Sequence, residues 1–143
     1  MHDTNEPAKR ILIVDDEPDV AGYLEMLLRD HGYETVTASN GHEAIDLARR
    51  SPPDLVTLDI SMPEASGTRF YKEFKTDPGL GSIPVVIITA VTGYGGDPYG
   101  YEKFIKGRKM VPPPDGFFPK PIEAEKLLAS IRELLAPARS GAG

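Results

Sequence analysis

Three acidic residues directly follow a short apolar segment near the start of the chain. The segment is Ile-Leu-Ile-Val at residues 11–14, and the acids are Asp15, Asp16 and Glu17. Crowded carboxylates resist joint ionisation, because like charges a few ångströms apart repel one another. A hard divalent cation would relieve the repulsion, and Mg²⁺ prefers one or two carboxylates together with water and phosphate oxygens. Asp16 could instead cap a following helix, and these residues alone leave both interpretations open.

A second apolar segment also ends in an acid. Residues 55–58 read Leu-Val-Thr-Leu, and Asp59 comes next. If the two segments are adjacent strands of a parallel sheet, Asp59 lies close to Asp15 and Asp16, because open parallel sheets bind ligands beyond the carboxyl ends of their strands. The three side chains would then form an oxygen-ligand site. A lone acid at the end of a strand is more often a turn former.

Two further residues could contact an anionic group at the same edge. Thr89 follows the apolar residues 85–88 and carries a hydroxyl that can donate a hydrogen bond, although such a hydroxyl is commonly satisfied within its own strand end. Lys120 lies between two prolines after Phe117 and Phe118, and its ammonium suits a phosphoryl group. Together with the acids, these residues indicate a pocket for a metal ion and a phosphoryl group.

The elements that must position these residues follow an alternating pattern. From Arg10 onward, short β-branched apolar runs alternate with longer stretches of helical periodicity, which is typical of a parallel sheet covered by helices. Asn40 and Glu43 have the spacing of a capping box, and Gly32 can end a helix in the left-handed conformation. We expect strands at 11–14, 35–38, 55–58, 85–88 and 117–118, and helices at about 18–31, 40–50, 66–76 and 123–135.

The order of acids, hydroxyl and lysine resembles the receiver domains of bacterial response regulators, similar to the single-domain chemotaxis regulators. The resemblance covers about residues 10–136. It implies a doubly wound, flavodoxin-like α/β fold with five parallel strands in the order 2-1-3-4-5. It also implies a phosphorelay signalling switch and not an enzyme, although such a domain assists its own phosphorylation and dephosphorylation.

The resemblance implies a role for each residue of the metal site. Asp59 would accept a phosphoryl group from a sensor histidine kinase or phosphotransfer protein in a reaction that needs Mg²⁺. Asp16 would be a direct Mg²⁺ ligand and Asp15 a water-mediated one. The backbone carbonyl of Ser61 would complete the protein ligands.

The resemblance also implies how the signal leaves the site. Lys120 and the metal would stabilise the transferred group, and Thr89 would then form a hydrogen bond to it. Phe117, the aromatic residue three positions before the lysine, would follow the shift of Thr89, with packing in the core as the competing interpretation. An unknown downstream protein would respond through altered contact with the chain.

The segment 91–116 departs from the family's pattern. Thr89 and Lys120 stand 31 positions apart, which is longer than we expect for the family, and the excess falls where a fourth helix belongs. The segment is rich in glycine and tyrosine, is locally basic and contains three consecutive prolines at 112–114. We therefore expect an atypical fourth-helix region that offers a docking surface to a partner or to a second copy of the chain.

Composition argues against several other classes. The chain has no cysteine, which excludes disulfides, a thiol nucleophile and Cys-type zinc sites, and suits the cytoplasm. A net charge of −6 argues against direct nucleic-acid binding. The longest apolar run, 83–91, is far shorter than the roughly 20 residues of a membrane span. Residues 1–9 and 137–143 are expected to be a flexible leader and tail, with no output domain.

The pattern bears on four alternative functions. A P-loop NTPase would need the motif G-x-x-x-x-G-K-[ST], which the sequence lacks. A flavodoxin-like phosphate-binding protein would need a glycine-rich or hydroxyl-rich loop after Val14, where acids stand instead. A phosphatase with an aspartyl nucleophile would want an acid at the position of Ser61. The remaining alternative is a scaffold of receiver fold that binds other proteins without phosphorylation.

Overall fold

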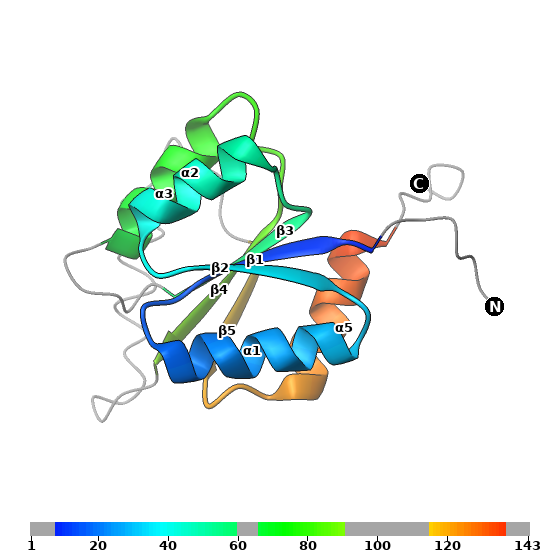
Figure 1. Ribbon diagram of the computed structural model, residues 1–143. Helices are drawn as coiled ribbons and strands as arrows, with labels where there is room; N and C mark the ends of the chain where they lie inside the picture. The colour runs from blue at the N-terminus through cyan, green and yellow to red at the C-terminus, as the bar shows by residue number, and fades with distance from the viewer. Residues whose placement is uncertain (1–7, 60–65, 91–114, 137–143) are drawn as a thin grey trace.

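The five apolar segments form one parallel sheet in the computed structural model of the chain (Figure 1), which describes residues 8–59, 66–90 and 115–136. The strands are β1 (Arg10–Val14), β2 (Glu34–Ala38), β3 (Leu55–Asp59), β4 (Val85–Ala90) and β5 (Gly116–Lys120). The helices are α1 (Pro18–Asp30), α2 (Gly41–Arg50), α3 (Ser66–Thr76) and α5 (Ala124–Leu135).

The strands lie in the order β2-β1-β3-β4-β5, which confirms the expected topology. All four neighbouring pairs are parallel. In this register Val14 lies opposite Ala38 on one side and Leu58 on the other, while Asp59 lies opposite Ile88. The strand ends that carry the predicted site residues therefore meet at one edge of the sheet.

Alternate residues of each strand pack against helices on opposite faces of the sheet. Figure 1 shows α2 and α3 covering one face and α1 and α5 covering the other. The first face buries Leu12, Val14, Val56, Leu58, Val85 and Ile87 with Ala44, Ile45, Phe70 and Phe74. The second face buries Ile11, Ile13, Leu55, Val86 and Ile88 with Leu24, Leu28, Leu127 and Ile131. Burial on both faces explains why the strands read as continuous apolar runs.

Local capping sets where the helices begin and end. The Asn40 side chain accepts a hydrogen bond from the Glu43 amide at 2.8 Å, as the capping box predicts. Gly32 follows α1 with φ of 91°, a conformation that glycine adopts without strain. The suggestion that Asp16 caps α1 is wrong. The N-cap position belongs to Glu17, whose side chain forms no capping hydrogen bond. The Glu17 amide donates to Asp15.

A buried lysine secures the edge of the sheet opposite the strands' carboxyl ends. The Lys75 amine, at the end of α3, donates hydrogen bonds to the carbonyls of Gly81 at 3.3 Å and Ile83 at 2.7 Å, and lies 3.8 Å from an Asp115 carboxylate oxygen. Asp115 is also bonded twice to Val85, through its backbone amide at 2.8 Å and its carboxylate at 2.9 Å. Burial lowers the pKa of Lys75, and the Asp115 charge opposes that change.

Some predictions fall outside the described residues. These include Ser61, residues 91–114 of the atypical segment predicted at 91–116, residues 1–7 of the predicted leader, and the predicted tail at 137–143. None of the helices in the described ranges has the length and apolarity needed to cross a membrane. The fifth strand, expected only at 117–118, extends over Gly116–Lys120.

Replacing Thr57 with valine tests the packing of the central strand. Thr57 is 1 % exposed, and its hydroxyl has no hydrogen-bond partner among the described residues. A buried hydroxyl without a partner costs free energy that a methyl group does not, so Thr57→Val should raise the free energy of unfolding by about 1 kcal/mol. Urea denaturation measures the change. The exposed Thr37→Val is the control, and a loss of stability in Thr57→Val alone would contradict the prediction.

Candidate functional site

Two buried acids lie next to each other at the carboxyl ends of the central strands. Asp15 follows β1 and is 4 % exposed, while Asp59 ends β3 and is 3 % exposed. β1 and β3 are hydrogen-bonded neighbours whose last paired residues are Val14 and Leu58, so each acid comes one position after that pair. The structure therefore brings together the two carboxylates that the sequence placed at one edge.

Backbone hydrogen bonds hold Asp15 in this position. Its amide donates to the Ala38 carbonyl at 3.0 Å and so extends the pairing of β1 with β2 by one residue. Its Oδ1 atom accepts from the Glu17 amide at 2.9 Å. A short polar side chain that accepts from an amide two residues on stabilises a turn. This turn leads the chain from β1 into α1.

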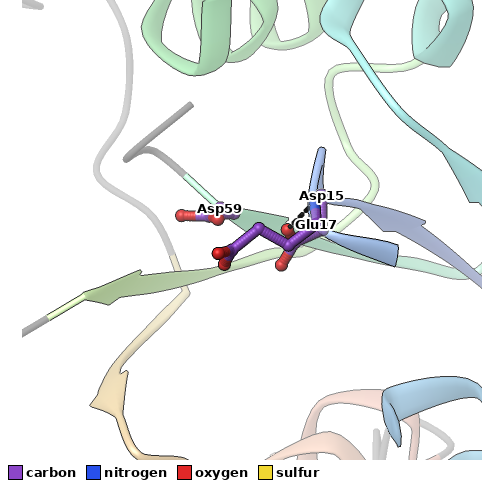
Figure 2. A group of neighbouring side chains, drawn as sticks. All are labelled: Asp15, Glu17 and Asp59. Carbon is purple, nitrogen blue, oxygen red and sulfur yellow. Dashed lines mark hydrogen bonds between the residues drawn. The ribbon is translucent and has the colours of Figure 1, made fainter. Parts of the chain in front are cut away.

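Glu17 joins the two aspartates in one group of carboxylates. One oxygen from each of Asp15, Glu17 and Asp59 lies within 4.8 Å of the others. Figure 2 shows the Glu17 side chain reaching from the start of α1 toward Asp59. The only sequence signal for Glu17 is its place as the third acid of a run. Asp16 is exposed and does not belong to this group.

The other predicted site residues lie on the two outer strands at the same edge. Thr89 follows the residue paired with Asp59 in β4 and is itself paired with Pro119. Lys120 ends β5 opposite Ala90. These pairings give the backbone positions of the two residues. The contacts of their side chains stay predictions. Phe117 is half-buried and packs against the core on the α2 and α3 face, so its role as a switch also stays a prediction.

The donor set fits a hard divalent cation. Three carboxylates supply only oxygen atoms, which are the ligands that Mg²⁺ prefers. Their negative charges repel one another at this separation, and two of the three side chains are buried, where water screens charge poorly. A bound cation would offset this repulsion. Among the described residues, Asp15, Glu17 and Asp59 form one group that could hold a metal ion.

Comparisons with known proteins show which family the chain resembles. The family model described as response regulator receiver domain matches residues 11–132. Protein Rrf1 of Nitratidesulfovibrio vulgaris is 36% identical over 92% of this chain and 86% of its own length. The polar-differentiation response regulator DivK of Brucella anthropi is 34% identical over 91% of this chain and 98% of its own length.

A solved structure shares the fold. The chemotaxis protein CheY4 of Vibrio cholerae superimposes with a TM-score of 0.75 at 26% identity, covering 90% of this chain and 99% of that protein. The fold and the sequence comparisons thus point to the same family.

Stability in the presence of Mg²⁺ tests whether the carboxylate group holds a cation. A ligand that binds only the folded state at ten times its Kd should raise the free energy of unfolding by about 1.4 kcal/mol. Asp15→Asn should reduce this increment, because it removes one of the buried negative charges from the group. Urea denaturation with EDTA or with MgCl₂ measures it.

Asp46→Asn is the matched control, since Asp46 is exposed on α2 and lies outside the group. It should keep the full increment. An equal Mg²⁺ increment in wild type and Asp15→Asn would show that the cation binds elsewhere.

Proposed function

The chain belongs to the response regulator receiver domain family, and on that premise we propose that it is a phosphorelay switch whose phosphoacceptor is Asp59. The phosphoryl donor would be a sensor histidine kinase or a phosphotransfer protein, and the phosphorylated chain would bind a downstream protein with altered affinity. We expect this exchange in the cytoplasm. Receiver domains in two-component signalling act as switches, and the proposal is that this chain does so through its own carboxylate.

The observation that carries the proposal is the position of Asp59. It ends the central strand β3, is almost fully buried, and has the carboxylates of Asp15 and Glu17 within 4.8 Å. A carboxylate oxygen of Asp59 would attack the phosphorus of a phosphohistidine. The new P–O bond forms as the P–N bond breaks, and the electron pair of that bond leaves with the imidazole nitrogen. The product is an acyl phosphate on Asp59.

The chain's own residues would contribute mainly alignment and charge. A Mg²⁺ ion held by the carboxylate group would neutralise part of the charge on the transferred phosphoryl oxygens. Asp16 and the Ser61 carbonyl would complete its protein ligands. Lys120, at the end of β5, would bind a phosphoryl oxygen through its ammonium. Fixed charges of this kind stabilise a transition state without reorganising during the reaction.

The output step would run along β4 and β5. Thr89 would donate a hydrogen bond to the phosphoryl group on Asp59. Because β4 pairs with β5, a movement of the end of β4 would be passed to β5, which carries Phe117. Phe117 lacks the hydroxyl of a tyrosine, so its contribution would come from the position of its ring. The changed surface near β5 would then alter contact with the downstream protein.

Intact mass after incubation with a small phosphodonor tests the proposal. With MgCl₂ and acetyl phosphate or phosphoramidate, the wild-type chain should gain the mass of one phosphoryl group. The gain should disappear with EDTA and in Asp59→Asn, because the amide oxygen cannot form the acyl phosphate.

Asp46→Asn serves as the control for loss of an exposed acid and should be phosphorylated like wild type. A mass gain that persists in Asp59→Asn would place the modification on another residue. No gain with any donor would favour a receiver-fold scaffold that binds its partners without phosphorylation.

A further inference from the structure

We propose that Asp115 and Lys75 are positioning residues for the phosphorylation of this chain. They act by holding the start of β5 in place, so that Lys120 at the other end of the same strand stays aligned with the phosphoryl group. The inference rests on the proposed function, because it concerns the same phosphoryl transfer. Asp115 directly precedes β5 and Lys120 ends it, so the strand itself connects the two edges of the sheet.

Asp115 is held by contacts with two other elements. Its amide donates to the Val85 carbonyl at 2.8 Å, and its carboxylate accepts from the Val85 amide at 2.9 Å. The Lys75 ammonium lies 3.8 Å from the same carboxylate oxygen. We call these contacts of Asp115 with Val85 and Lys75 the β5 anchor. They join the start of β5 to the first residue of β4 and to the last turn of α3.

Lys75 is itself fixed, so it gives Asp115 a partner in a defined place. Its side chain is 5 % exposed, and its ammonium donates to the carbonyls of Gly81 at 3.3 Å and Ile83 at 2.7 Å. Hydrogen bonds from a charged donor are stronger than those between neutral groups, and water screens a buried charge poorly. The ammonium cannot follow a displaced β5 without losing these bonds.

Strand β5 has few features of its own that would fix its position. It lies at the edge of the sheet and pairs with β4 alone in the described part of the chain. Pro119 has no N–H to donate to the ladder, and Gly116 has no side chain to pack. Phe117 and Phe118 pack against opposite faces of the core, but both stay partly exposed. The β5 anchor adds the contacts that this strand lacks.

The extended strand transmits a displacement from Asp115 to Lys120. A shift along the axis of a strand moves both of its ends in the same direction, because an extended backbone is short of slack. Fixed charges stabilise a transition state only where they point at the developing charge, and small misplacements reduce the rate strongly. A loosened β5 should therefore slow phosphoryl transfer while the carboxylates at the ends of β1 and β3 keep their places.

The test is the rate of phosphorylation of the full chain by acetyl phosphate in MgCl₂, followed as intact mass over time. Asp115→Ala removes the carboxylate from Val85 and Lys75, and should slow the reaction by roughly threefold to tenfold. Asp115→Asn keeps an oxygen that can accept from the Val85 amide, so it should restore most of the rate. Lys75→Met removes the other partner of the β5 anchor and should also slow the reaction.

Arg49→Gln is the matched control. It removes an ion pair with Asp77 at 3.2 Å that joins two other parts of the chain and does not include β5. An exposed pair of this kind contributes little to stability, so the rate should stay within about twofold of wild type.

A Lys120→Gln background distinguishes positioning from a general loss of structure. If the β5 anchor acts through Lys120, Asp115→Ala should slow phosphorylation by less than about twofold in this background, because the group that it positions is already gone. Hydrogen–deuterium exchange should be faster in residues 116–120 of Asp115→Ala and unchanged in β1 and β3.

The outcomes separate this inference from the proposed function. Equal slowing by Asp115→Ala in the wild-type and Lys120→Gln backgrounds would overturn the inference, because the effect would then not pass through Lys120. A wild-type rate in both Asp115→Ala and Lys75→Met would overturn it as well. In either case the phosphorylation of Asp59 would stand. No phosphorylation of the wild-type chain would overturn the proposed function and, with it, the positioning role of the β5 anchor.

Discussion

The common direction of the five strands is the constraint on which the site depends. Because every neighbouring pair is parallel, all carboxyl ends meet at one edge of the sheet. The central position of β1 and β3 then places Asp15 and Asp59 where helices cover both faces, so the two charges are both adjacent and shielded from water. Without a bound cation, such a concentration of negative charge destabilises the folded state. It would become useful if, as proposed, a cation and a phosphoryl group bind at the same edge.

Most of the fold could be predicted from the sequence because the local signals agree with the tertiary structure. Burial of both sheet faces requires apolar runs, and the four strongest runs are strands β1 to β4. The fifth strand was harder to delimit, because Pro119 cannot donate a ladder hydrogen bond and only Phe117 and Phe118 gave a signal. The alternative in which Asp16 caps α1 is wrong, because the helix begins one residue later, with Glu17 at the N-cap position.

The sequence predicts only those residues of the candidate site whose positions follow from where a strand ends. Asp15 and Asp59 follow directly from the register of β1 and β3. Glu17 does not, because its approach to Asp59 depends on the turn that Asp15 Oδ1 stabilises, and a run of three acids does not reveal which of them turns inward. The backbones of Thr89 and Lys120 reach the expected edge, while their hydrogen-bonding roles depend on side-chain geometry that no sequence pattern specifies.

The contacts of Asp115 bear on how this domain can diversify. Asp115 is bonded through both its amide and its carboxylate to Val85, and Lys75 lies beside it, so the start of β5 is tied to the start of β4. These local contacts hold the two strand starts together, in addition to the pairing of β4 with β5. Residues can therefore be inserted or lost between β4 and β5 while Lys120 keeps its place at the sheet edge. The length and sequence of the connecting segment can in this way change without moving the strand end that carries Lys120.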